Sequence, residues 1–271
     1  MPTETVSEFL RSATKQLQKA GIETARLDVL VLLEDALGRD RSSVIAHPED
    51  ILEPGIAQNL DTRIAQRAQH IPLAYIRGKA EFYGRTFTVN PHVLVPRPES
   101  EALIELLKTA KLPKDAQIAD IGTGSGCLGI TAALELSATA VDLYDIDPNA
   151  LEIATQNAGR YDIKATTYQE DLLSGAQARA YDMLLANLPY VPEIMQLNEA
   201  AKHEPPHAIF SGPAGLDHYK RFWTQVAKLN HKPHYIVTES LPSQHHALAQ
   251  LARSAGYYLE ARNDFAQLFA L

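Results

Sequence analysis

Residues 120–126 read D-I-G-T-G-S-G, and this stretch decides the fold. It closes a short β-rich run, Q-I-A-D-I at 117–121, and comes directly before a segment with helical spacing at 127–135. Glycines let the backbone turn tightly between strand and helix, and they let a ligand approach without a Cβ in the way. We therefore expect a flat, polar ligand to bind at this turn.

The glycine spacing alone leaves two ligand classes open. Gly124, Gly126 and Gly129 also satisfy the G-x-G-x-x-G spacing of dinucleotide-binding domains. An NAD-dependent dehydrogenase is therefore an alternative, although such enzymes usually carry the turn nearer the N-terminus.

Short β-rich runs alternate with helical segments from residue 117 to the C-terminus. This order predicts a doubly wound α/β sheet with helices on both faces, whose ligands bind beyond the carboxyl ends of the strands. The tail predicts two final strands, which we expect to form an antiparallel pair at the sheet edge. The expected strands are 117–121, 140–145, 181–186 and 235–238, and the expected helices are 127–135, 148–158 and 244–255.

The first 77 residues have helical periodicity instead. Three apolar stripes predict a bundle of amphipathic helices, and Gly38 is expected to end the second. Residues 81–91, E-F-Y-G-R-T-F-T-V-N-P, alternate around Gly84 as a β-hairpin would. We expect a helical domain at 1–77, a hairpin linker at 78–96 and an α/β domain at 97–271. The stripes are Val6, Phe9, Leu10, Ala13 and Leu17; Leu27, Leu30, Leu33 and Leu37; and Ile56, Leu60 and Ile64.

Charge and composition exclude several classes of function. The net charge is −8, and neither half is basic enough for stand-alone nucleic-acid binding. A basic cluster could meet RNA or an acidic partner, but an ordinary solvated face is the favoured interpretation. The N-terminus has no secretory leader, no apolar run is long enough to span a membrane, and the single cysteine, Cys127, fits a packing role. We expect a cytoplasmic protein. The basic residues are Arg63, Arg67, Arg77, Lys79 and Arg85, opposed by Glu81.

Acidic residues at strand ends supply the next candidate ligands. Asp145 ends the strand after the glycine turn, where a carboxylate can accept hydrogen bonds from both hydroxyls of a ribose. Asp142 lies mid-strand, and Asp147 before a proline is typical of a helix N-cap, so we assign the ribose to Asp145. Asp171 could face an adenine amino group with Leu172 against the ring, although a solvated loop is an equal alternative.

Asn187, Leu188, Pro189 and Tyr190 follow the fourth strand of the predicted sheet, beside the glycine turn. Asparagine offers an acceptor oxygen, the backbone carbonyls before a proline stay outside any helix, and tyrosine offers a flat face. Such a site suits a planar nitrogen, which must be held by its N–H groups and turned toward a methyl donor. An ordinary Asn-x-Pro turn is less consistent with the glycine turn and Asp145 upstream.

These motifs together resemble the release-factor glutamine methyltransferases along nearly the whole chain. L-V-P-R-P-E-S-E at 94–101 is similar to a segment, I-P-R-P-D-T-E, that precedes the methyltransferase domain in that family. The resemblance implies a Rossmann-like class I S-adenosylmethionine-dependent methyltransferase fold. It also implies an N-terminal domain that recognises class I release factors, and methylation of the glutamine in their Gly-Gly-Gln loop. Other stretches that agree lie at 25–33, 72–84, 120–129, 145–154, 203–208 and 212–219.

The resemblance also implies roles for individual residues. Asn187 and Tyr190 would be catalytic, and Asn187, Leu188, Pro189 and Tyr190 would receive the glutamine amide. Arg97, Glu101 and Glu204 are family positions expected to hold the loop around the site. His203 and His207 flank two prolines and are not expected to bind a metal. The residues expected to contact the cofactor are Gly122, Thr123, Gly124, Ser125, Gly126, Asp145, Asp171, Leu172 and Asn187.

Two departures from the family pattern are present: the first, at Leu188, bears on the substrate, and the second indicates a diverged or minimal member. The family's usual tetrapeptide is Asn-Pro-Pro-Tyr, whereas this chain has Leu188 in second place, as rRNA adenine dimethylases do. The chain also ends in N-D-F-A-Q-L-F-A-L, where the family usually has a charged D-R pair and a longer last strand. An adenine-N6 methyltransferase acting on nucleic acid is therefore the alternative. It does not explain the helical domain, and its acidic α/β half would suit phosphate poorly.

Overall fold

The computed structural model describes residues 4–138 and 140–271. The chain forms two compact units. One comprises Met1–Gly78 with Asn198–His203, and the other comprises Lys79–Leu197 with Glu204–Leu271. The functional boundaries expected at 77/78 and 96/97 stay a prediction.

The first unit is a helical bundle with its own apolar core. A capping box between Thr5 and Glu8 begins the first helix, and Gly38 in a left-handed conformation ends the second, as predicted. The predicted second stripe is wrong at Leu27, which is 46% exposed. The helices are α1 (Val6–Lys19), α2 (Ala25–Leu37), α3 (Arg41–Ala46), α4 (Pro54–Ala68) and α5 (Leu73–Arg77).

A seven-stranded sheet forms the centre of the second unit, in the order β5-β4-β3-β6-β7-β9-β8. The first five strands are parallel, and β9 inserts antiparallel between β7 and the edge strand β8. The predicted doubly wound fold and the antiparallel pair at its edge are confirmed. The strands are β3 (Ile118–Ile121), β4 (Ala140–Asp145), β5 (Lys164–Gln169), β6 (Met183–Ala186), β7 (Tyr235–Glu239), β8 (Tyr258–Arg262) and β9 (Ala266–Ala270).

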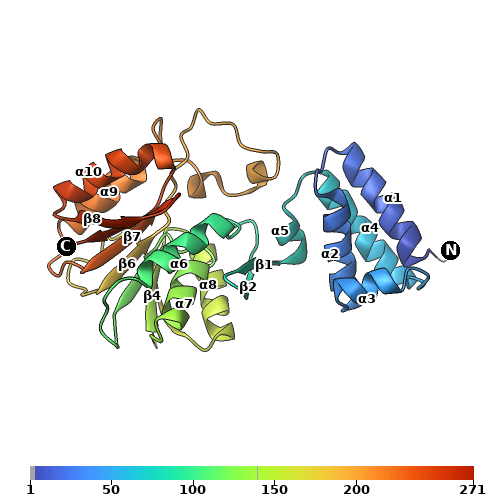
Figure 1. Ribbon diagram of the computed structural model, residues 1–271, viewed down its shortest axis with the longest axis horizontal. Helices are drawn as coiled ribbons and strands as arrows, with labels where there is room; N and C mark the ends of the chain where they lie inside the picture. The colour runs from blue at the N-terminus through green and yellow to red at the C-terminus, as the bar shows by residue number, and fades with distance from the viewer. Residues whose placement is uncertain (1–3, 139) are drawn as a thin grey trace. The chain divides into compact units, whose positions relative to one another are not determined.

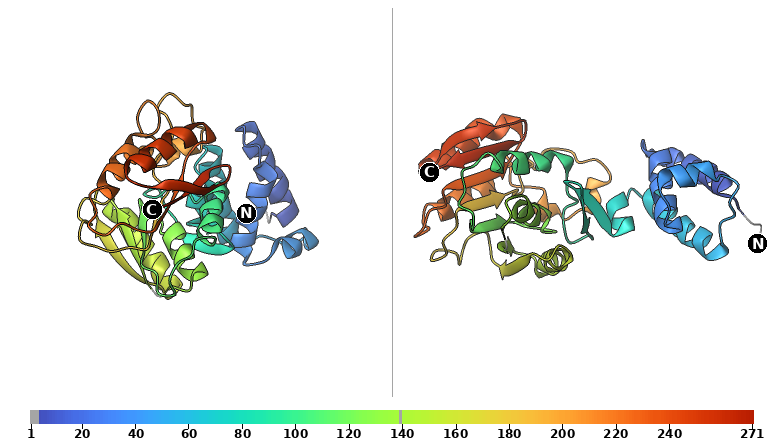
Figure 2. Two further views of the ribbon diagram at one scale, coloured as in Figure 1. Left: turned by 60° about the vertical axis from the view of Figure 1, so that its left-hand side comes forward. Right: turned by 60° about the horizontal axis from the view of Figure 1, so that its bottom comes forward.

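Helices cover both faces of this sheet (Figures 1 and 2). Because side chains alternate along a strand, residues such as Ile118 and Ala119 belong to different apolar cores. One core contains residues of α6 (Glu101–Leu107), α7 (Cys127–Glu135) and α8 (Pro148–Arg160). The other contains residues of α9 (Asp217–Val226) and α10 (His245–Ser254).

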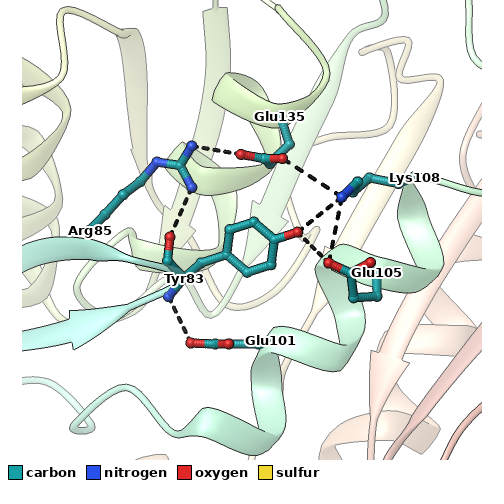
Figure 3. Close-up of polar contacts among 6 residues, drawn as sticks. All are labelled: Tyr83, Arg85, Glu101, Glu105, Lys108 and Glu135. Atoms are coloured by element: carbon teal, nitrogen blue, oxygen red, sulfur yellow. Dashed lines mark hydrogen bonds and ion pairs between the residues drawn. The ribbon is translucent and has the colours of Figure 1, made fainter.

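The predicted hairpin is present as β1 (Lys79–Phe82) and β2 (Arg85–Thr88), which pair antiparallel around Tyr83 and Gly84. Both turn residues have positive φ, as a type I′ turn requires. Figure 3 shows how polar contacts hold the turn. The Tyr83 amide donates to Glu101 Oε1 (2.8 Å), its hydroxyl contacts Glu105, and Arg85 reaches Glu135 on α7 (2.6 Å). The hairpin is thus fixed to the α/β unit.

Three members of the basic cluster have acidic partners. Arg67 pairs with Asp28 at 2.7 Å, Arg77 with Asp35 at 2.7 Å, and Arg85 with Glu135 at 2.6 Å. These arginines therefore make internal ion pairs, which favours a structural role for them over a role in RNA binding. Across residues 4–138 and 140–271, no helix combines the length and apolarity needed to cross a bilayer.

Candidate active site

The candidate site lies where the parallel strands end and the strand order reverses. From β3 the chain crosses to β4 on one side, whereas β6 pairs with β3 on the other. The loops after these strands therefore meet at a topological switch point, where doubly wound folds bind ligands. A cavity of about 560 Å³ opens there.

Most of the predicted site residues line this cavity together. Gly126 and Tyr190 do not, because Gly126 caps α7 and the Tyr190 hydroxyl turns to Glu239. The predicted residues that line it are Gly122, Thr123, Gly124, Ser125, Asp145, Asp171, Leu172, Asn187, Leu188 and Pro189.

The glycine turn needs its glycines for two reasons. Gly122, Gly124 and Gly126 have φ values of 72°, 53° and 80°, in the left-handed region that side chains disfavour. A Cβ on Gly122 would also lie only 3.2 Å from Leu188 Cδ2. The turn after β3 and the tetrapeptide after β6 therefore pack directly against each other.

Backbone hydrogen bonds tie the turn to the neighbouring strand. The Gly122 and Thr123 amides both donate to the Tyr144 carbonyl, at 2.9 and 2.8 Å. The Gly124 amide donates to Asp145 Oδ2 at 2.9 Å. The glycine turn thus holds Asp145, the residue predicted to bind the ribose, in place.

Two carboxylates, the buried Asp120 and the partly buried Asp145, lie beside the turn. Asp120 Oδ2 accepts from the Thr123 hydroxyl (2.7 Å) and the Gly129 amide (2.9 Å), yet burial raises the pKa of Asp120 to about 6. Burial also raises the pKa of Asp145, against hydrogen bonds from the Asp147 and Gly124 amides. Among the described residues, no cation pairs with either carboxylate. A positively charged ligand would therefore stabilise the ionised form of both.

Asp171 and Leu172 also line the cavity. The Asp171 carboxylate pairs with Arg221, and about half of each side chain is exposed. Leu172 is buried with a φ of 58°, a strained conformation for a leucine. The expected contacts of this pair with an adenine stay a prediction.

Asn187 has a fixed orientation in the structure. Its Nδ2 donates to Ser100 Oγ (2.9 Å) and Glu239 Oε2 (3.2 Å), which uses both amide hydrogens. Among the described residues, no protein group donates to Asn187 Oδ1 or to the Leu188 carbonyl. Two acceptor oxygens at the cavity are therefore free for a substrate.

The segment 93–97, which contains the first two residues of the P-R-P motif, also lines the cavity. Arg97 pairs with the buried Glu204 at 2.5 Å, and Glu204 also accepts from the Val95 amide at 3.0 Å. These two residues hold the loop, as expected. Glu101 does not, because its carboxylate binds the hairpin turn at Tyr83.

Sequence reasoning missed several residues of the site. Ile146, 59% exposed, lines the cavity directly after Asp145 and offers an apolar surface to a flat ring. Ser100 and Glu239 contact Asn187 from distant positions in the chain. Glu239 ends strand β7, so the strand-end signal that identified Asp145 was available for it.

The packing role expected for Cys127 is consistent with the structure, and the expectation that His203 and His207 bind no metal stays a prediction. Burial raises the pKa of the Cys127 thiol to about 12, which keeps it protonated and unreactive. His207 lines the cavity and His203 does not.

Comparison with known proteins identifies the family to which this chain is similar. The PrmC N-terminal domain model matches residues 8–78, and the methyltransferase small domain model matches residues 98–204. A release factor glutamine methyltransferase of Koribacter versatilis is 39% identical, covering 82% of this chain and 81% of that protein. That of Coxiella burnetii is 36% identical, covering 79% and 78%.

Solved structures share the fold at low identity. The hMettl16 catalytic domain in complex with a MAT2A 3′UTR hairpin has a TM-score of 0.52 at 14% identity, covering 82% of this chain and 84% of that one. The T. thermophilus 16S rRNA N2 G1207 methyltransferase, in complex with AdoMet and guanosine, has a TM-score of 0.50 at 21% identity, covering 71% and 49%. These likenesses support the fold alone.

The residues of the cavity fit the cofactor that the family implies. The glycine turn leaves room for a close approach, Asp145 presents a carboxylate, and the buried Asp120, which no cation pairs with among the described residues, suits a positively charged sulfonium or ammonium group. The family match covers most of the chain and of its relatives. The chain therefore belongs to the release factor glutamine methyltransferase family, and its cofactor is S-adenosylmethionine.

Proposed function

We propose that this protein methylates the side-chain amide of the glutamine in the Gly-Gly-Gln motif of class I peptide chain release factors. The observation that carries the proposal is the pair of free oxygens, Asn187 Oδ1 and the Leu188 carbonyl, at a cavity shared with the glycine turn. A primary amide has two N–H groups, and these oxygens would accept one each.

The residues of the turn would hold the cofactor. Asp145 would accept the ribose hydroxyls, and Asp171 and Leu172 would face the adenine. Bound there, S-adenosylmethionine supplies an electrophilic methyl group. Because Gly122 packs against Leu188, the turn and the acceptor tetrapeptide share one wall of the cavity.

The acceptor residues would supply orientation. An amide nitrogen is a poor nucleophile because its lone pair is delocalised into the carbonyl. Asn187 and Leu188 would fix both N–H groups so that the nitrogen is turned toward the methyl group. The predicted packing of Tyr190 on the amide plane would require its ring to move into the cavity, which it does not line in this structure. No general base is needed, because the methylated nitrogen is acidic enough to release a proton afterwards.

The helical unit, residues 1–77 by the predicted boundary, would recognise the release factor. The presence of this unit supports a protein substrate rather than RNA, because methylation of adenine would give the unit no role. The net charge of −8 supports the same choice, and we expect no stable nucleic-acid binding.

The test uses labelled S-adenosylmethionine with a release factor, with its Gln→Ala loop variant, and separately with rRNA. Mass spectrometry then locates the label. We expect label on the loop glutamine and none on the variant. Label on adenine alone would refute the proposal and favour the nucleic-acid methyltransferase.

A further inference from the structure

Glu239 is a buried acid directly behind the acceptor tetrapeptide. It ends strand β7 and is 1% exposed. Among residues 4–138 and 140–271 no cation pairs with it, and it does not line the cavity. Burying an unpaired carboxylate costs free energy of folding, so the presence of Glu239 at this position suggests a functional role.

Two hydrogen bonds to its carboxylate come from the acceptor tetrapeptide. Glu239 Oε1 accepts from the Tyr190 hydroxyl at 2.8 Å, and Oε2 accepts from Asn187 Nδ2 at 3.2 Å. Burial raises the pKa of Glu239, and hydrogen bonds from Ser100, Tyr190 and Asn187 act in the opposite direction. One carboxylate thus connects the residues at both ends of the tetrapeptide.

This connection decides which face of the Asn187 amide meets the substrate. An ionised carboxylate only accepts hydrogen bonds, so it must face Asn187 Nδ2, and Oδ1 is then turned away from Glu239. Without that constraint the amide could rotate and present its own N–H groups to those of the acceptor. Two donors facing each other cannot bind.

We propose that Glu239 is a positioning residue of the acceptor site, which aims Asn187 Oδ1 at the acceptor N–H and fixes the Tyr190 ring. It acts through these residues and touches neither substrate nor cofactor. The inference rests on the proposed function for the identity of the acceptor, but the hydrogen-bond arrangement can be tested without it.

The test exchanges donor and acceptor between two isosteric pairs. Glu239→Gln replaces one of the two acceptor oxygens by an NH₂ group, so that Asn187 Nδ2 and the Tyr190 hydroxyl are left with a single acceptor. Asn187→Asp places a carboxylate against Glu239. Combined, the two changes restore one donor facing one acceptor with the same total charge. The double variant also keeps an oxygen at position 187 directed at the acceptor.

We expect each single variant to lower kcat about tenfold to a hundredfold, with little change in the S-adenosylmethionine dissociation constant. The double variant should recover kcat to within about tenfold of wild type. Glu135→Gln is the matched control, because it removes a partly buried carboxylate from the same unit without contact to the tetrapeptide. It should leave kcat unchanged.

A second measurement does not need a substrate. The side-chain amide protons of Asn187 should exchange slowly with solvent in the wild type and faster in Glu239→Gln, by NMR of selectively labelled protein. Equal exchange, or a double variant no more active than the singles, would overturn the positioning role. If the wild type shows slow exchange but does not methylate the release factor, the proposed function fails and the positioning role stands.

Discussion

Replacing Asp120 by asparagine removes a buried charge but keeps the shape of the side chain. Both described hydrogen bonds of Asp120 end on one oxygen, from Thr123 and Gly129, and an asparagine oxygen can accept both. The main change is therefore electrostatic. The wild-type pKa of about 6, against 3.8 in an unfolded chain, corresponds to a cost of about 3 kcal/mol above both values.

The sign follows from the raised pKa. The contribution of Asp120 to stability is fully present below its unfolded value of 3.8 and is lost as pH rises through about 6. In the free energy of unfolding, Asp120→Asn should therefore exceed the wild type by about 1 to 2 kcal/mol near pH 5 and by about 3 kcal/mol near pH 8, and should match it only below pH 3.8. Asp145 and Glu239 also have raised pKa values, so only the difference between the two proteins isolates Asp120.

Urea unfolding measures this difference. The single tryptophan, Trp223, is buried in a core of the α/β unit, so its fluorescence reports on the unit that contains Asp120. The wild type and Asp120→Asn should also differ in their affinity for the cationic S-adenosylmethionine. The affinity of the wild type should weaken below about pH 6, where Asp120 is protonated. The variant should bind more weakly than the wild type near pH 8, and its affinity should change less with pH. A stability difference that is equal at both pH values would refute the reasoning.

Three further changes test neighbouring parts of the site. Asn187→Ala should reduce methyl transfer about a hundredfold or more but leave S-adenosylmethionine binding within about tenfold, by calorimetry and single-turnover kinetics; loss of binding alone would contradict this. Gly122→Ala and Gly124→Ala both place a side chain at positive φ and should each cost about 1 to 2 kcal/mol of stability; Gly122→Ala should in addition weaken cofactor binding, because its Cβ would lie 3.2 Å from Leu188 Cδ2, whereas a Cβ at Gly124 meets nothing within 4 Å. Tyr219→Phe removes a buried hydroxyl that contacts the Ala186 and Glu239 carbonyls, and should lower the free energy of unfolding by about 1 to 3 kcal/mol; an unchanged urea midpoint would refute that role.

The sheet was predictable because its signals are local. The run before Gly122, the strand ending at Asp145 and the alternation of short strands with helices all lie within windows of a few residues. Helices α3 and α5 were missed because they are one or two turns long, with one buried residue and none, respectively. A pattern of this length has no period to detect.

Leu27 shows how a tertiary contact overrides a pattern. The side chain of Asp28 is buried in α2 because Arg67 on α4 binds it at 2.7 Å. A polar residue thereby occupies the inner face, and the buried stripe runs through Ala25, Val29 and Leu33 instead. No helical-period argument contains this pairing, because its partners are 39 residues apart.

The residues of the site likewise fall into those that local sequence signals identify and those that only the folded chain brings together. The turn residues and Asp145 were identified by spacing, whereas Ser100 and Glu239 reach Asn187 across 87 and 52 residues. Only the folded sheet brings them together. Glu101 was misplaced for a related reason: its proximity to Arg97 in sequence suggested the loop, but α6 carries its side chain to the hairpin.

Leu188, the departure that favoured an adenine substrate, has a local explanation in the structure. Its backbone N–H, which a proline would lack, lies 3.4 Å from the Tyr219 hydroxyl, inside the core. Its side chain is 1% exposed and packs toward Gly122, on the cofactor side of the tetrapeptide. The carbonyl that would receive a substrate N–H is present with either residue. Position 188 therefore adapts to the core and the glycine turn, so its identity does not discriminate between an amide and an adenine acceptor.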